Sequence, residues 1–237
     1  VGAYYPNLTI ENNYTSQWVT SAGSIFTGNS GYPTIKGNFD IGGSGSNTVD
    51  FLNDNTNAQP VTVIGNTTIR SGNILRNNGT GYEFRGNLSV IGSIIYGASN
   101  TRTLNFTGST SQSISVAGSL GIYNMTINKS SNDLTLNNAI TVDNILTFTS
   151  GRIFSTSTNL LTINTNGSVA SASNSSFTSG PVRYVGLSAF MFPIGKSSSY
   201  QPLGISAAST STSDFTSEYL IANPQTTFNN VLSPTLN

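Results

Sequence analysis

The chain has 237 residues, with nine basic and nine acidic side chains, no cysteine and no histidine. A formal net charge of zero and a charged fraction of 8% exclude strong electrostatic attraction to nucleic acid or to anionic membrane surfaces. The lack of histidine and cysteine excludes Ser-His-Asp and Cys-His catalytic sites, and zinc sites with the usual ligands, within this chain. A hydrophobic fraction of 36%, with 12 phenylalanines and 10 tyrosines, predicts a folded chain.

Residues 1–33 contain short apolar segments separated by asparagine and glycine turns, and we expect them to form an N-terminal cap. This segment is rich in aromatic residues: Tyr4, Tyr5, Tyr14, Trp18 and Tyr32. Such rings either stack on a sugar ligand or fill the hydrophobic plug that closes the end of a repeat array. Trp18, Tyr14 and Tyr32 are therefore candidate ligand-binding residues, with core packing as the alternative.

Residues 34–169 read almost entirely as short strands, in which apolar residues alternate with Thr, Ser or Asn, as in Leu88-Ser89-Val90. Glycine or asparagine interrupts these strands every few residues, and the apolar spacing of a helix is absent. An antiparallel sandwich and a parallel β-solenoid both fit such a pattern. The Gly-Asn pair at 65–66 recurs at 86–87, and this regular step favours an all-β, parallel β-solenoid (β-helix).

A longer internal match joins VIGNTTIRSGNIL at 63–75 to VDNILTFTSGRIF at 142–154. Laid over each other, these segments place Val63 on Val142 and Ile69 on Phe148. We interpret them as two copies of one stacked unit, because repetition at a fixed period indicates stacked supersecondary units.

The step from Gly37 to Gly65 is longer than the others, and this predicts an inserted loop at 47–58. Calcium accepts carboxylate, amide and backbone oxygens, so the loop is a candidate calcium site. Its candidate ligands are Asp50, Asn53, Asp54, Asn55 and Asn57, and the alternative is an ordinary loop of Asx turns. We expect no other cofactor.

After Val169 the pattern changes, and we expect a small-residue linker at 170–176 followed by a β-sandwich-like module at 177–237. Prolines at strand starts or edges break the repeat in this part. About 60 residues are few for an independent β-sandwich, so the module is expected to continue beyond Asn237.

Several segments resemble large secreted surface proteins of Bacteroidota: LNFTGSTSQSIS from Leu104, IYNMTIN from Ile122, ILTFTSGRI from Ile145, and the later SGPVRY, FPIGK and YQPL. The resemblance covers roughly residues 60–225 and implies export by the type IX secretion machinery. It also implies a role as a surface adhesin or matrix component.

The first functional hypothesis is a secreted, non-catalytic stalk or fibre-forming β-solenoid at the outer cell surface, with surface glycans or further copies of the chain as partners. The sequence contains no run of 18 apolar residues, so it predicts no membrane-spanning helix, and no signal peptide is visible at Val1. The alternative is a carbohydrate-active or carbohydrate-binding β-helix with its site in the 47–58 loop. None of the nine acids recurs at the repeat spacing that would pair two carboxylates for glycoside hydrolysis.

Overall fold

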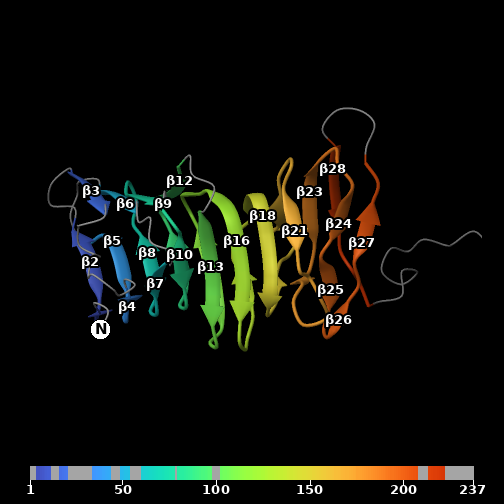
Figure 1. The fold of residues 1–237 in the computed structure, drawn as a ribbon, viewed down its shortest axis with the longest axis horizontal. Coiled ribbons are helices and arrows are strands. Elements are labelled where there is room, and N and C mark those ends of the chain that lie inside the picture. Colours follow the sequence, from blue (N-terminus) through green and yellow to red (C-terminus); the bar gives the residue numbers. More distant parts are fainter. Residues whose placement is uncertain are drawn as a thin grey trace, which may run out of the picture.

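The chain forms a parallel β-solenoid, as the repeat predicted. The computed structural model describes residues 4–11, 16–20, 34–43, 49–53, 60–77, 79–97, 102–207 and 213–221. Successive strands advance along the long axis of the molecule, from β2 at one end to β27 and β28 at the other (Figure 1). Within the described residues no helix is long and apolar enough to cross a membrane.

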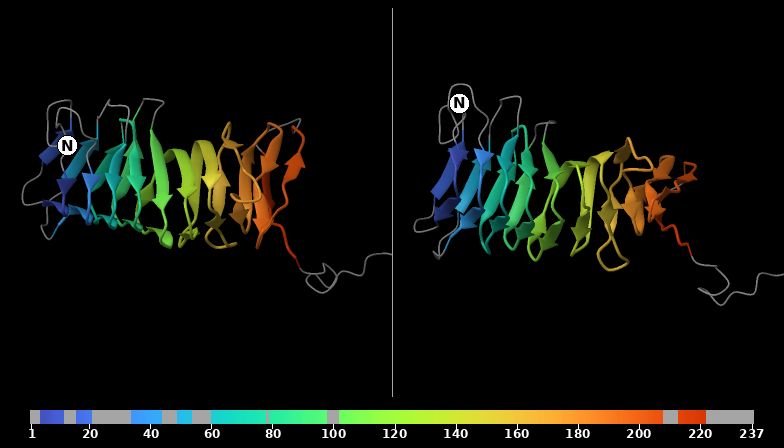
Figure 2. Two further views of the ribbon diagram at one scale, coloured as in Figure 1. Left: turned by 60° about the horizontal axis from the view of Figure 1, so that its bottom comes forward. Right: turned by 90° about the horizontal axis from the view of Figure 1, so that it is seen from below.

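Two long sheets, A and B, run along the molecule, and a shorter sheet C covers a third side of its first half (Figure 2). Sheet A has eleven strands: β1 (Tyr4–Tyr5), β4 (Thr34–Ile35), β7 (Val61–Val63), β10 (Tyr82–Phe84), β13 (Thr103–Gly108), β16 (Ile122–Lys129), β18 (Ile140–Ser150), β20 (Leu161–Ile163), β23 (Val182–Gly186) and β28 (Ser213–Ser217), with β21 (Ser168–Ala170) paired to β18. Sheet B has ten: β2 (Leu8–Glu11), β5 (Phe39–Gly42), β8 (Thr67–Ile69), β11 (Leu88–Val90), β14 (Gln112–Val116), β17 (Leu134–Leu136), β19 (Ile153–Phe154), β22 (Thr178–Ser179), β25 (Ile194–Lys196) and β26 (Ser199–Tyr200).

Sheet C contains β3 (Ser16–Thr20), β6 (Val49–Asn53), β9 (Ile74–Asn77), β12 (Ser93–Tyr96) and β15 (Ser119–Leu120). A two-stranded sheet at the far end contains β24 (Phe190–Phe192) and β27 (Leu203–Ile205). One strand from each of the sheets A, B and C makes one turn of the solenoid, here called a rung. Sheet C ends at β15, and the long strands β16 and β18 of sheet A follow.

The core consists of columns of apolar side chains that stack from rung to rung. One column in sheet A contains Ile35, Val63, Phe84, Phe106, Ile127 and Phe148, each completely buried. The polar residues between them face outward, as the alternation predicted. Each rung buries its apolar face only against its neighbours, so the core is continuous along the described rungs.

A ladder of asparagines stabilises the turn between sheets A and B. The backbone N–H of Asn38, Asn66 and Asn87 donates in each case to the side-chain oxygen of the asparagine one rung earlier, at 2.8–2.9 Å. We call Asn7, Asn38, Asn66 and Asn87 the asparagine ladder. The glycine before each of its last three members allows the turns to stack, because a Cβ there would collide with the previous turn.

The internal match between 63–75 and 142–154 is wrong as a prediction of which strands stack. Phe148 belongs to the sheet A column of Val63, whereas Ile69 lies in sheet B between Ile41 and Val90. The matched segments therefore begin in the same sheet, at Val63 and Val142, but their later residues lie on different faces of the solenoid. The reason is that strands of every face share one alternating pattern, and backbone pairing alone decides which strands stack.

The segments predicted at the two ends are built into the same sheets. Within residues 1–33, β1, β2 and β3 pair in parallel with β4, β5 and β6 and form the first described rung. The expected linker at 170–176 does not interrupt the sheets, because β22, β23 and β25 continue the parallel pairing beyond it. Antiparallel pairing in the described chain involves chiefly β26, β27 and β28, which follow β25 in sequence.

Candidate functional site

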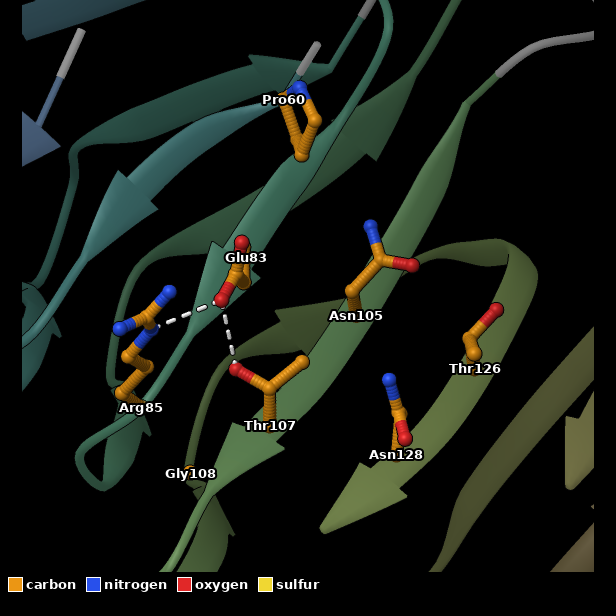
Figure 3. Close-up of a pocket in the computed structure, with 8 residues that line it drawn as sticks. All are labelled: Pro60, Glu83, Arg85, Asn105, Thr107, Gly108, Thr126 and Asn128. Carbon is orange, nitrogen blue, oxygen red and sulfur yellow. Dashed lines mark hydrogen bonds and ion pairs between the residues drawn. The ribbon is translucent and has the colours of Figure 1, made fainter. Parts of the chain in front are cut away.

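A groove of about 500 Å³ on the outer face of sheet A joins several rungs (Figure 3). It crosses β10, β13 and β16, which are consecutive strands of that sheet. We call it the polar groove and define it by the residues that line it: Pro60, Glu83, Arg85, Asn105, Thr107, Gly108, Thr126 and Asn128.

The strand register places the lining side chains in two rows. Glu83, Asn105 and Thr126 lie opposite one another on the three strands, and Thr107 lies opposite Asn128. Their apolar sequence neighbours point into the core, so alternation forces these polar groups outward. Adjacent members of a row are about 4.8 Å apart, the spacing of neighbouring strands.

One end of the groove holds an internally neutralised charge pair. The Arg85 Nε donates to Glu83 Oε1 at 2.7 Å, and the Thr107 hydroxyl donates to the same oxygen at 2.8 Å (Figure 3). The Thr62 hydroxyl donates to Glu83 Oε2 at 3.3 Å. Both carboxylate oxygens are therefore engaged, and Glu83 is the one carboxylate in the lining. Glycoside hydrolysis usually needs two carboxylates across a cleft.

The remaining carboxylates described are mostly tied to basic side chains. Ion pairs join Asp40 to Arg70, Asp50 to Arg76, Asp133 to Arg152, Asp214 to Arg183 and Glu218 to Lys196. The hydrogen bond from Arg183 lowers the pKa of Asp214. Several of these pairs join residues on adjacent strands of a sheet, so they pin one rung to the next.

The loop predicted at 47–58 is partly a strand. Residues 49–53 form β6, which pairs in parallel with both β3 and β9 as one more strand of sheet C. The Arg76 Nε–H donates to both oxygens of the Asp50 carboxylate, at 2.6 and 2.8 Å. This contact raises the pKa of Arg76. A calcium ion at Asp50 would have to displace that guanidinium.

The other predicted site residues are only partly covered by the structure. Asp54, Asn55 and Asn57 lie outside the described residues, as do Tyr14 and Tyr32. The backbone of Asn53 belongs to β6, and that of Trp18 belongs to β3, where it pairs opposite Phe51. No group of three acidic residues within metal-binding reach occurs among the described residues. Calcium binding therefore stays a prediction.

A second cluster of polar groups lies where sheet C ends. Arg102 is only 4% exposed. Its guanidinium stacks on the rings of Tyr96 and Tyr123, at 5.2 and 4.6 Å from the respective ring centroids. The Tyr96 hydroxyl donates to Asp143 Oδ2 at 2.6 Å, and this bond, with burial, raises the pKa of Tyr96 to about 12. Asn164 donates to the other oxygen of Asp143. These contacts fill a corner of the solenoid.

Sequence reasoning missed the polar groove, although the repeat contained a usable signal. Glu83, Asn105 and Thr126 occupy the middle of the strands YEF, LNF and MTI, which recur at the rung spacing. Following the outward position from strand to strand would have placed them in one row. Comparisons of the chain with family models, curated proteins and solved structures give no match, so the resemblance to Bacteroidota surface proteins stays a prediction.

Proposed function

We propose that this chain is a rigid spacer, the stalk or fibre segment of a secreted or surface-attached adhesive protein. The observation that carries the proposal is the unbroken pairing of sheets A and B from β1 and β2 to β23 and β25. A solenoid of this kind gains about 4.8 Å of length with each rung while every rung contacts only its neighbours.

The contacts between rungs suit a load-bearing element. The apolar columns, the asparagine ladder and ion pairs such as Asp40–Arg70 all act along the solenoid axis, in addition to the backbone hydrogen bonds. The exterior is rich in threonine, serine and asparagine, which keep a low-charge surface hydrated. Such a surface supports an extracellular location and gives no attraction to nucleic acid.

The proposal is tested by changing the number of rungs. The chain is placed between a cell-surface anchor and a binding head, and extra copies of residues 83–104 are inserted after Leu104, because Glu83 pairs with Asn105 across one rung. Four extra copies should raise the head by about 20 Å, measured as its height above the membrane. A glycine-serine linker with the same number of residues is the control.

The spacer should keep the head at one height that rises by the same step with each copy, whereas the flexible linker, a random coil, should give a much broader distribution of heights. If the height does not change with the number of copies, or if its distribution is as broad as that of the linker, the spacer proposal is wrong.

A further inference from the structure

We infer that the polar groove binds an uncharged, hydroxyl-rich oligosaccharide that lies across β10, β13 and β16, roughly along the solenoid axis. The inference rests on the proposed adhesive function and names the ligand class through which the spacer would also attach to a surface. It moves the carbohydrate site from the 47–58 loop to the outer face of sheet A.

Hydrogen-bonding capacity in the groove is open in the described part of the chain. Asn105 Nδ2 donates to the Tyr82 carbonyl at 3.1 Å, but no described group bonds to its Oδ1. Asn128 Oδ1 accepts from the Ser150 hydroxyl at 3.1 Å, while its Nδ2 and the Thr126 hydroxyl have no described partner. In Figure 3 the side chains of Asn105, Thr126 and Asn128 project from the same side of the sheet and form no bonds with one another.

These open groups are both donors and acceptors, as a ligand bearing hydroxyl groups requires. A hydroxyl both donates and accepts, so it can bond to an amide oxygen, an amide nitrogen or another hydroxyl. An apolar ligand would leave these groups unsatisfied, which costs affinity. The volume of about 500 Å³ falls in the usual range for small-ligand sites.

The charges in the groove select against charged ligands. Arg85 and Glu83 neutralise each other, and Thr107 and Thr62 complete the hydrogen bonds of the carboxylate. Breaking this pair to bind an anion through Arg85 would leave Glu83 without its counter-charge. An uncharged ligand uses the groove without this cost.

The row geometry gives the direction of the ligand. Asn105 and Thr126 are partners in adjacent strands, as are Thr107 and Asn128, so equivalent polar groups repeat at the strand spacing along the axis. A chain of repeating hydroxyl-bearing units laid across the strands meets a similar set of groups at each rung.

The test titrates the full chain with cellohexaose, xylohexaose and mannohexaose, and with trigalacturonate as an acidic probe. Binding is followed by NMR through the side-chain amide signals of Asn105 and Asn128. We expect at least one neutral hexasaccharide to shift both signals. The double variant Thr126→Val and Asn128→Ala should weaken its affinity about tenfold, because two hydrogen bonds are lost.

Thr135→Val is the matched control, because Thr135 is an exposed threonine at the centre of β17 on sheet B. It should leave the affinity unchanged. If the double variant does not fold, Asn128→Ala alone replaces it, since Asn128 is exposed. The inference is overturned if no neutral probe shifts the groove signals, if trigalacturonate binds more tightly, or if the control weakens binding as much as the double variant. The rung-number experiment does not depend on this result, so each proposal fails by itself.

Discussion

The side-chain oxygen of Asn66 accepts the backbone N–H of Asn87 at 2.9 Å, across a separation of 21 residues. The Asn66 N–H in turn donates to Asn38 Oδ1 at 2.9 Å. This relationship converts a local turn residue into a contact between rungs. The same asparagine fixes its own turn and the position of the next one.

The asparagine ladder should therefore be sensitive to substitution although its side chains are exposed. We expect Asn66→Ala to lower the free energy of unfolding by about 1–2 kcal/mol, because the Asn87 N–H loses its partner. Asn159→Ala, at a partly exposed asparagine outside the ladder whose side chain has no hydrogen bond in the described structure, should change it by less than about 0.5 kcal/mol. Urea unfolding of both variants measures the difference, and equal effects would contradict a role of the ladder in stability.

The glycine before Asn87 should be intolerant of a side chain. A Cβ at Gly86 would overlap the carbonyl oxygen and carbon of Gly65 in the preceding rung. These are backbone atoms, which cannot move aside as a flexible side chain can. We expect Gly86→Ala to destabilise the fold by about 2–3 kcal/mol, as overpacking does. Gly204→Ala is the control, because the nearest atom there is the flexible Met191 Cε at 3.2 Å. Thermal or urea unfolding should separate the two variants, and an unaffected Gly86→Ala would disprove close stacking at this turn.

Lys129 should make stability depend on pH at the alkaline end. Its side chain is buried, and Nζ donates to the Thr110 carbonyl at 2.9 Å and to Gln112 Oε1 at 3.1 Å. Burial lowers the pKa of Lys129 in the folded protein. The unfolded chain then binds this proton more tightly, so stability should rise as pH increases from the folded pKa to the ordinary value near 10.5.

Lys129→Met removes this titration and leaves the other groups in place. The stability advantage of the natural chain over the variant should therefore be larger at pH 10.5 than at pH 7. Urea unfolding of the two proteins at several pH values checks this. A constant difference, or one that shrinks with rising pH, would show that burial does not penalise the charged lysine.

Arg102 should contribute more through its volume than through its charge. Its Nε is buried and has no hydrogen-bond partner in the described structure, while its guanidinium stacks on Tyr96 and Tyr123. We expect Arg102→Met to change the free energy of unfolding by less than about 1 kcal/mol, because the lost ring contacts are offset by removal of a buried, unsatisfied donor. Arg102→Ala should cost about 2–4 kcal/mol, since it leaves a cavity. Similar losses in both variants would instead show that the charge is essential.

The sequence by itself determined the all-β fold, the outward and inward faces of the strands, and the parallel stacking. Alternation in strands such as Leu88-Ser89-Val90 is enough to assign faces, because side chains alternate across a strand. The Gly65-Asn66 and Gly86-Asn87 pairs recur for a physical reason, namely that stacked turns exclude a Cβ and require the asparagine bond.

Tertiary structure alone decided which strands stack, which charges pair and where a ligand can lie. Ile69 and Phe148 look equivalent in sequence but lie in different sheets, since every strand carries the same degenerate pattern and turns of unequal length shift the register. Asp50 looked like a loop residue until pairing with β3 and β9 placed it in a strand beside Arg76. The polar groove arises from residues one rung apart, and only backbone pairing brings Glu83, Asn105 and Thr126 into one row.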